Sequence, residues 1–332
     1  MLLLYRKNKE TKKGVVDSLK KNKIFVMGSY VTDLTARASH LPKPGETVFG
    51  QSFRTGAGGK GSNQAVAAAR LGAEVTLVTK LGDDAFGKLA LEHFTKEQID
   101  TSQIAIDKEM PTGSALIAVD DQSENMIVVT AGACGKIKRE EIEQAEEKLA
   151  DVAIALTQLE TNLDAVERTL ELAEKHHIPV ILNPAPYQAI PNEWLKKAAY
   201  ITPNETEAAQ LTGIRLETEE DARLAAEKLY QMGVANVVIT LGKKGCFLYN
   251  EEYKGKVFPG LIMDAVDTTG AGDAFNGGLA YALANEVELI EALQFANIVG
   301  ALAVTKEGTA QAMPTLAEVE TCLKHSLLEV KS

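Results

Sequence analysis

The sequence has few cysteines and no long hydrophobic segment. Cys134, Cys246 and Cys322 lie far apart among 332 residues, and none is part of a CxxC pair. So sparse and odd a set excludes a disulfide framework and predicts a reducing, cytoplasmic location. No apolar run approaches the roughly 18 residues that a membrane-spanning helix needs. The sequence therefore predicts no membrane association.

Basic residues are in the minority. The chain has 35 Lys and Arg against 46 Asp and Glu, which gives a formal net charge of −11. An acidic protein lacks the basic face that binds phosphates, and this argues against nucleic acid as a partner. The amino-terminal end is an exception, because residues 1–23 hold eight basic and two acidic side chains. We interpret residues 1–22 as a basic, disordered tail, with a partner-binding or nucleic-acid-binding arm as the alternative.

Several common site patterns are missing. There is no GxxxxGK[ST] motif, so any nucleotide must be held without a P-loop. The five histidines have no metal-ligand spacing, and no Ser, His and Asp set suggests a nucleophilic triad. The remaining composition, 45% hydrophobic and 24% charged, is that of an ordinary globular protein and excludes disorder of the whole chain.

Short apolar runs alternate with helical segments and predict an α/β fold. A buried strand is expected at 24–27, and later strands are expected to end at Glu160, Asn183 and Asn204. Regular alternation of strands and helices gives a parallel sheet with helices on both faces. Ligands bind beyond the carboxyl ends of such strands. We therefore expect these polar strand ends to share a cleft.

Two early segments have the pattern of β-hairpins instead of helices. They cover about residues 32–57 and 110–131, and they can pair into one small sheet. A helix from Ser62 to Leu71 follows the first of them. We expect one α/β domain over residues 23–325, with a small β-sheet lid made by the two hairpins.

The segment from Asp267 to Asp273, Asp-Thr-Thr-Gly-Ala-Gly-Asp, is the most informative stretch. We expect a strand to end near Val266 and a helix of small residues to begin at Ala274. Glycines between them allow a tight turn whose free N–H groups form an anion site. Asp273 is then either a plain N-terminal cap or a general base for a hydroxyl that attacks phosphorus.

A glycine-rich stretch, Gly56 to Gly61, matches G-x-G-x-x-G. A dinucleotide fingerprint should follow the first strand of the fold directly, but here hairpin-like sequence intervenes. The other interpretations are close approach of the backbone to a small polar ligand, with Lys60 and Asn63 as polar contacts, or a glycine turn that serves helix packing. The sequence leaves these alternatives open.

Two further strand ends carry weaker patterns. Asn204 and Glu207 place oxygen atoms on one face of a helical turn, which suits hydrated Mg²⁺, but the same pair resembles a capping box. The glycine loop from Thr240 to Gly245 is compatible with nucleotide contact or with a simple turn.

Taken together, four motifs resemble the PfkB family of carbohydrate kinases, and within it the ribokinase group. They are GGKGSNQA at 58–65, NPAP at 183–186, TPNETE at 202–207 and DTTGAGD at 267–273. The likeness runs from about residue 23 to 320, with the motifs in the family's order. It implies a ribokinase-like three-layer α/β/α fold with a mostly parallel central sheet and a β-sheet lid. It also implies transfer of the ATP γ-phosphoryl group to a sugar hydroxyl, O5 of D-ribose.

The resemblance assigns roles to individual residues. Asp273 matches the family's base, and Gly270, Ala271 and Gly272 match its anion hole. The implied sugar contacts are Val31, Thr32, Asp33, Gly59, Lys60, Gly61, Asn63, Glu160 and Asp273. The implied nucleotide contacts are Asn204, Glu207, Thr240, Gly242, Gly245, Gly272 and Asn297.

Two cations and a second subunit are implied as well. Mg²⁺ accompanies ATP, and Asn204 and Glu207 organise it through water. K⁺ is an expected activator, bound largely by carbonyl oxygens of Asp267, Thr269, Ala303, Lys306, Gly308 and Ala312. Ribokinases pair through the lid, so a homodimer through the β lid is expected here.

Two positions depart from the family's pattern. Val31 stands where ribokinases carry an Asn that contacts sugar hydroxyls, and deoxyribokinases resemble this chain in having an apolar residue there. A hydroxyl that faces valine loses a partner, at a cost of ~1–3 kcal/mol, so 2-deoxyribose is an alternative substrate. Ala312 stands where ribokinases often have Ser, which is harmless if the ligand is a backbone carbonyl.

Other functions remain open at this stage. They are a different sugar kinase of the family, an NAD-dependent oxidoreductase, and a catalytically silent sugar sensor whose basic tail contacts DNA. The intact Asp273 argues against a silent protein.

Overall fold

A computed structural model of the chain describes residues 22–122 and 124–329, and for 325–329 it describes only the backbone. The predicted basic tail thus lies outside the described residues except for Asn22, whose N–H donates to the carbonyl of Ala284. Among the described residues, no helix is both long and apolar enough to cross a membrane.

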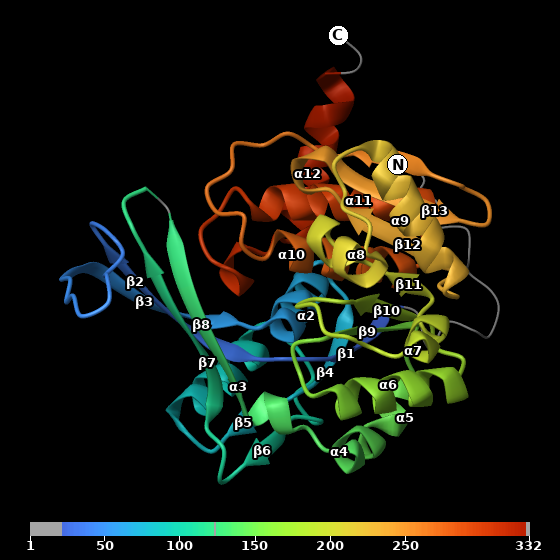
Figure 1. Cartoon of the computed structure of the whole chain (residues 1–332). Helices are drawn as coiled ribbons and strands as arrows, with labels where there is room; N and C mark the ends of the chain where they lie inside the picture. The colour runs from blue at the N-terminus through green and yellow to red at the C-terminus, as the bar shows by residue number, and fades with distance from the viewer. Residues whose placement is uncertain (1–21, 123, 330–332) are drawn as a thin grey trace.

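A mixed sheet of eight strands forms the centre of the molecule, in the order β14-β13-β12-β11-β10-β9-β1-β4 (Figure 1). The strands are β1 (Lys23–Met27), β4 (Glu74–Val78), β9 (Ile154–Gln158), β10 (Val180–Asn183), β11 (Tyr200–Ile201), β12 (Asn236–Thr240), β13 (Gly245–Asn250) and β14 (Lys256–Pro259). Neighbours from β4 to β12 pair in parallel, and β13 and β14 add an antiparallel edge. The predicted, mostly parallel sheet is confirmed.

Side chains of β1 alternate between two hydrophobic layers, as the pleat of a strand requires. Ile24 and Val26 pack into one layer, and Phe25 and Met27 pack into the other. Because both faces are covered, residues 24–27 of this strand are all apolar and buried. Burial on both faces of the sheet therefore explains the continuous apolar run at residues 24–27.

Helices cover both faces of the sheet (Figure 1). One face carries α2 (Lys60–Arg70), α3 (Ala85–Lys96), α10 (Ala271–Ala284), α11 (Leu289–Ala303) and α12 (Leu316–Glu329). The other carries α4 (Arg139–Gln144), α5 (Glu146–Ala150), α6 (Leu163–Lys175), α7 (Asn192–Lys197), α8 (Glu205–Thr212) and α9 (Glu219–Gln231). Short 3₁₀ turns are η1 (Ala133–Lys136), η2 (Gly242–Lys244) and η3 (Ala310–Ala312). The predicted three-layer α/β/α arrangement is confirmed.

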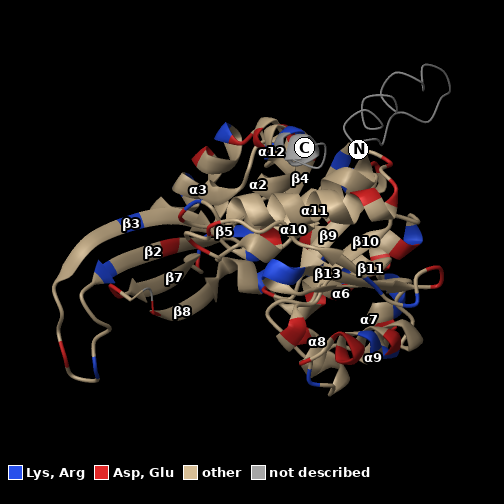
Figure 2. Ribbon diagram, turned by 90° about the horizontal axis from the view of Figure 1, so that it is seen from above, with Lys and Arg blue, Asp and Glu red and all other residues tan. Residues whose placement is uncertain are grey.

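The two segments predicted as hairpins pair into one four-stranded sheet, which we call the lid (Figure 2). Its strands, in spatial order, are β3 (Gly50–Gly58), β2 (Val31–Ala38), β7 (Thr112–Val119) and β8 (Asn125–Gly132). Each hairpin is antiparallel, and β2 joins β7 in parallel. A separate pair, β5 (Lys80–Gly82) with β6 (Ala105–Asp107), lies below the lid.

The strand predicted near Val266 does not form. Residues 260–270 are a loop, and Val266 is 61% exposed. The N–H groups of Val266 and Asp267 both donate to the carbonyl of Val304, just beyond α11. An apolar residue in a short run gives no information about a partner strand, and the described sheet already ends at β14.

Candidate functional site

Asp273 lies in the first turn of α10, which begins after Gly270 in a left-handed conformation (φ 79°). Its carboxylate is only 6% exposed and accepts hydrogen bonds from Asn63 Nδ2 and Gln64 Nε2, each 2.9 Å away. No side-chain cap closes the N-terminus of α10. The interpretation of Asp273 as a plain N-terminal cap is therefore wrong, because its oxygens face α2.

Gln64 connects Asp273 to the sheet. Its Nε2 group also donates to Asn183 Oδ1 at 3.0 Å, and its Oε1 accepts from Gln158 Nε2 at 2.7 Å. Asn183 in turn donates to the carbonyl of Thr202 at 3.0 Å. These bonds fix the amide orientation of Gln64 so that an N–H faces the carboxylate. Asn183 was expected at the shared cleft as a polar strand end, and it lines the cleft described below. Gln64 stood in a quoted motif without a role, and Gln158 was not predicted.

A second amide holds the turn itself. Asn276 donates to the carbonyl of Gly272 at 2.8 Å and accepts from the hydroxyl of Thr202 at 2.6 Å. A Cβ on Gly272 would meet no atom within 4 Å, so the backbone here borders open space. N–H groups in the first turn of a helix attract anions, and the helix dipole adds to the attraction.

A cleft opens at the carboxyl ends of the parallel strands, beside the turn. It is lined by Lys60, Asn183, Ala185, Thr202, Asn204, Glu207, Thr240, Thr268, Gly270, Ala271, Gly272, Asp273 and Asn276. Segments far apart in sequence therefore supply the predicted base, the predicted anion hole and the predicted nucleotide contacts Asn204, Glu207 and Thr240 to one cavity.

Lys60 is the cationic side chain of this cleft. Burial acts to lower the pKa of its ammonium group, but the carboxylates of Asp273 and Glu160 outweigh burial, so the pKa of Lys60 is raised. The side chain therefore stays positively charged next to the anion site, where it can balance the charge of a phosphate.

Asn204 and Glu207 form a capping box at the start of α8. Glu207 N–H donates to Asn204 Oδ1 at 2.8 Å, and Asn204 N–H donates to Glu207 Oε2 at 2.9 Å. Burial raises the pKa of Glu207. The cap interpretation is confirmed, and both residues also line the cleft. No group of three or more His, Cys, Asp or Glu side chains in the described residues is placed to hold a metal ion.

Two carboxylates lie at the junction of lid and body. Glu160 Oε2 accepts from Ser29 Oγ at 2.5 Å and from the N–H of Lys60 at 2.8 Å. Asp33, on β2, lies 3.0 Å from the hydroxyl of Thr309. Burial raises the pKa of Asp33 from its ordinary 3.8 to about 6, against the opposing hydrogen bond.

Other predicted sugar contacts divide between the two faces of β2. Val31 and Asp33, two residues apart, share a face, whereas Thr32 points to the opposite face and its hydroxyl bonds with that of Tyr30. Thr32 is 2% exposed.

The glycines of the G-x-G-x-x-G match have packing reasons. A Cβ on Gly59 (φ 88°) would lie 2.8 Å from Tyr30 Cα, and one on Gly61 would lie 2.6 Å from Gly28. The motif begins inside β3 of the lid and does not follow β1, so it lacks the βαβ context of a dinucleotide site. Close contact with the backbone of the β1–β2 turn requires glycine at Gly59 and Gly61.

Some predicted nucleotide contacts do not line the cleft. Gly245 (φ 100°) lies against Phe258, where a Cβ would be 2.0 Å from the carbonyl oxygen. Asn297, buried on α11, donates to the same carbonyl at 3.1 Å. Gly242 begins the η2 turn with φ 55° and open space around it.

The predicted potassium ligands come from two neighbouring segments. Asp267 accepts from Thr269 N–H at 2.9 Å and from Gly308 N–H at 3.1 Å, which joins the loop before α10 to the segment after α11. Burial opposes ionisation of Asp267, but hydrogen bonds from Thr269 and Gly308 outweigh it and lower its pKa. Of the other predicted ligands, Lys306 pairs with Glu318, and Ala303 and Ala312 are buried.

We compared the chain with known protein families and with characterised proteins. Residues 21–316 match the model of the pfkB family carbohydrate kinases. Ribokinase from Haemophilus influenzae is 41% identical over 303 residues, which cover 91% of this chain and 99% of that protein. Deoxyribokinase from Salmonella typhi is 36% identical over 296 residues, covering 89% of this chain and 96% of that protein.

A solved structure agrees with the sequence comparisons. Arabidopsis thaliana ribokinase complexed with ribose and ATP superposes with a TM-score of 0.86 at 31% identity, and the match covers 92% of this chain and 99% of that one. The likeness extends over nearly the whole chain and includes the fold described above. This chain belongs to the pfkB family of carbohydrate kinases.

Proposed function

We propose that the protein transfers the γ-phosphoryl group of ATP to O5 of D-ribose, giving ribose 5-phosphate, with Asp273 as the general base. The observation that carries this proposal is the placement of the Asp273 carboxylate. It is held by two amide donors on α2 and lies in the same helical turn as the anion-binding backbone of Gly270 to Gly272. The ribokinases among its relatives support the choice of sugar.

The chemistry follows from the arrangement. Asp273 takes the proton of the sugar hydroxyl as its oxygen attacks the γ-phosphorus in line. The N–H groups of the turn and the Lys60 ammonium stabilise the negative charge that the phosphoryl group carries. A lid that covers the sugar keeps water from the phosphoryl group and limits ATP hydrolysis.

Metal ions support the same reaction. The family implies a divalent cation with ATP, and the oxygen-rich wall of the cleft at Asn204 and Glu207 fits Mg²⁺ held through water and phosphate. Mg²⁺ neutralises phosphate charge when it is bound. For potassium, Asp267 and its hydrogen-bond partners join the two segments that would surround the ion, the loop that leads into the anion-hole turn and the segment after α11.

A second candidate substrate is 2-deoxy-D-ribose. Val31 is 4% exposed and shares the face of β2 that carries Asp33. A sugar hydroxyl that faces this side chain finds no partner, which removes the advantage of ribose at that position. The deoxyribokinase relative supports this alternative.

The lid supports a homodimer. Large hydrophobic side chains of its strands and of the β2–β3 turn are exposed, among them Phe49 (94%), Phe53 (67%), Leu116 (56%) and Val128 (63%). Exposed apolar area of this kind on one sheet is typical of a protein interface. We also place the protein in the cytoplasm, since Cys134 and Cys246 are buried thiols outside any disulfide.

A coupled assay of ADP release tests the substrate. Ribose, 2-deoxyribose, fructose and nucleosides are compared by kcat/KM, each with K⁺ or Na⁺ as the only monovalent cation. The proposal expects ribose or 2-deoxyribose to be the best substrate and K⁺ to raise the rate. A ribose preference of tenfold or more rejects the deoxyribose alternative, and the absence of pentose-dependent ADP release rejects the proposed function.

The Asp273→Asn variant tests the base. We expect kcat to fall by ~10²–10⁴-fold, as the loss of a positioned base typically causes, while ribose and ATP still bind in calorimetry. Asp164→Asn, which changes an exposed carboxylate in the first turn of α6, is the matched control and should keep the wild-type rate. More than a tenth of wild-type kcat in Asp273→Asn would reject Asp273 as the base.

A further inference from the structure

The segment 307–311, which follows α11, contacts the lid. Glu307 forms ion pairs with Arg54 of β3 at 3.3 Å and with Arg37 of β2 at 3.9 Å. These pairs are half-exposed and contribute little free energy by themselves. They show that the lid strands and segment 307–311 lie against each other.

The same segment lies against the anion-hole turn on its other side. Gly308 N–H donates to the carboxylate of Asp267, which also accepts from Thr269 N–H. A Cβ on Gly270 would lie 3.5 Å from Thr309 Cα. Segment 307–311 therefore stands between the strand that carries the proposed sugar contacts and the turn that would bind the phosphoryl group.

Thr309 is the residue of this segment that contacts Asp33, one of the proposed sugar-binding residues. It is 9% exposed, and its hydroxyl lies 3.0 Å from Asp33 Oδ2 and 2.9 Å from the carbonyl of Ala57. A hydroxyl has one proton, so it donates to one of these acceptors at a time. Among the described residues, no side chain or backbone group forms a hydrogen bond with the other carboxylate oxygen, Asp33 Oδ1.

We propose that Thr309 is a positioning residue for the sugar: its hydroxyl holds Asp33 Oδ2 and leaves Oδ1 directed to a sugar hydroxyl. This inference rests on the proposed function, because it assumes that Asp33 binds the sugar. No motif in the sequence pointed to Thr309, which lies 276 positions from Asp33.

Electrostatics explain why Asp33 needs such a partner. Burial, together with the negative charges of Glu160 and Asp273, opposes ionisation of Asp33, whereas the Thr309 hydrogen bond and the charge of Arg54 favour it. A buried carboxylate without a fixed donor loses both charge and orientation. Thr309 supplies the donor that is itself buried and held by the fold.

Replacement of Thr309 by valine tests the proposal, since valine has nearly the same shape and no hydroxyl. We expect KM for the better pentose substrate to rise roughly tenfold or more, as for the loss of a hydrogen bond to a charged group. KM for ATP should stay unchanged and kcat should fall no more than about twofold. Thr309→Ser should restore the pentose KM. The control is Thr169→Val, which removes a buried hydroxyl bond within α6 and should change neither KM.

A double-mutant cycle shows whether Thr309 acts through Asp33. Pentose binding is measured by calorimetry, without turnover, for the wild type, Asp33→Asn, Thr309→Val and the double variant. Loss of affinity from Thr309→Val should vanish when Asp33 is already Asn, whereas additive losses would overturn the proposal. Should Thr309→Val not fold, Thr309→Ala replaces it with the same expected results.

The remaining outcomes separate this inference from the proposed function. An unchanged pentose KM in Thr309→Val, an equal rise in the KM for ATP, or no rescue by serine would overturn the role of Thr309 in an active kinase. A wild-type protein that binds and phosphorylates no pentose would overturn the proposed function, and this inference with it.

Discussion

Asp273 depends on side chains that no local pattern connects to it. Its donor Asn63 lies 210 positions earlier in the chain. The sequence of the turn identifies Asp273 as a residue of interest, because glycines before a helix of small residues indicate an anion site. Ruling out a plain cap needed the direction of the carboxylate, which the packing of α2 against α10 sets.

Asp33 should make sugar binding depend on pH. Its pKa in the folded protein is about 6, raised from 3.8 mainly by burial. We expect KM for the pentose to rise as pH falls through about 6, because the protonated acid is a poorer acceptor for sugar hydroxyls. A kinetic pH series from about 5 to 8 at saturating ATP measures this.

The control for this series is Asp33→Asn, which should bind pentose weakly and lose the acidic limb of the profile. A pentose KM that stays constant in the wild type across the series would contradict the prediction. The ionisation of Asp33 has the opposite effect on folding: it favours sugar binding but disfavours the folded state. A raised carboxyl pKa favours the folded state below about 3.8, and that stability is lost as pH rises through about 6.

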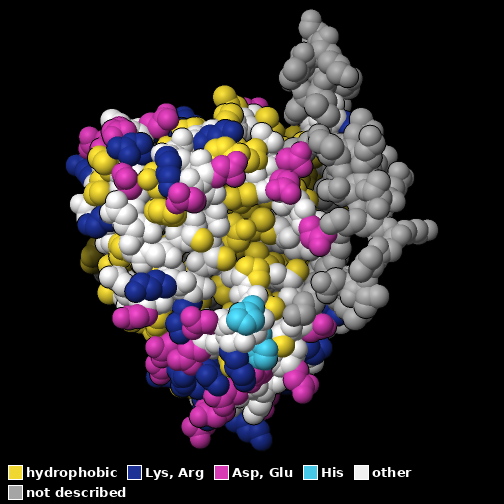
Figure 3. All heavy atoms as spheres, turned by 90° about the vertical axis from the view of Figure 1, so that its right-hand side faces the viewer, with side chains coloured by type: hydrophobic (Ala, Val, Ile, Leu, Met, Phe, Trp, Pro, Cys, Tyr) yellow, Lys and Arg dark blue, Asp and Glu magenta, His cyan; other side chains and the backbone are white. Residues whose placement is uncertain are grey.

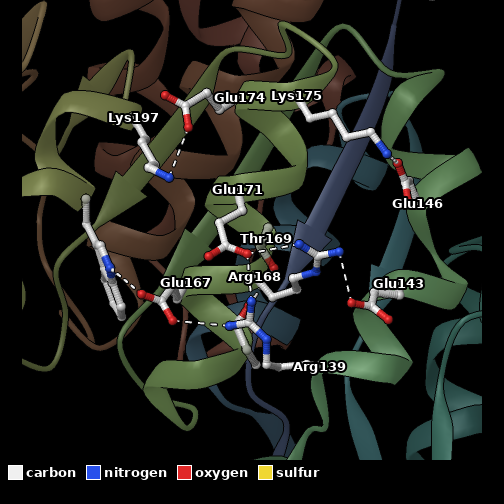
Figure 4. Close-up of polar contacts among 12 residues, drawn as sticks. Arg139, Glu143, Glu146, Glu167, Arg168, Thr169, Glu171, Glu174, Lys175 and Lys197 are labelled. Atoms are coloured by element: carbon white, nitrogen blue, oxygen red, sulfur yellow. Dashed lines mark hydrogen bonds and ion pairs between the residues drawn. The ribbon is translucent and has the colours of Figure 1, made fainter.

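At the scale of elements, α6 is tied to α4 by a network of ion pairs (Figure 4). The carboxylate of Glu171 forms ion pairs with Arg139 of α4 at 2.7 Å and with Arg168 of its own helix at 2.9 Å. Arg168 also forms an ion pair with Glu143 of α4 at 2.9 Å. The face seen in Figure 3 shows charged side chains of both signs gathered at the height of these helices. The shared carboxylate of Glu171 offsets the repulsion between the two arginines that it holds close together.

Glu171→Gln should therefore lower the stability of the folded protein by roughly 1 kcal/mol, the upper range for half-exposed pairs. Thermal unfolding at pH ~7 measures this. Glu174→Gln is the control, since Glu174 is 60% exposed and, within the described part of the chain, forms an ion pair with Lys197 alone. Equal melting temperatures for the two variants would contradict the prediction. Burial acts to raise the pKa of Glu171, but the hydrogen bonds and charges of Arg168 and Arg139 outweigh burial and lower this pKa. The contribution of Glu171 to the free energy of unfolding is therefore present above about pH 4.5 and is lost as pH falls through the pKa of the folded state.

The loop at residues 260–270 shows the limit of reading elements from local patterns. Val266 and its apolar neighbours have the composition of a strand, yet the N–H groups of Val266 and Asp267 donate to the carbonyl of Val304, just beyond α11, and not to a partner strand. Strand formation depends on a neighbour supplied from elsewhere in the chain. The helix that follows was predictable, because its glycine turn is a local signal.

At the scale of the whole molecule, the lid is a sheet that exposes large apolar side chains to solvent. Phe53 on β3 and Val128 on β8 are 67% and 63% exposed. We expect Val128→Asp to convert a dimer to a monomer in sedimentation at micromolar concentration, because a buried unpaired charge weakens an apolar interface. Leu224→Asp, at a 41% exposed position of α9, is the control and should leave the assembly unchanged. A wild-type monomer would contradict the prediction.

By itself, the sequence determined the α/β class, the lid segments and the turn that holds Asp273. These follow from local signals: apolar runs, strand–helix alternation and glycines at tight turns. The tertiary structure alone decided that Gln64 and Asn63 face Asp273, that Thr309 reaches Asp33, and that residues near Val266 form no strand. The reason is physical. Backbone preferences act between neighbours in sequence, whereas hydrogen bonds between distant side chains form only after helices and strands have packed.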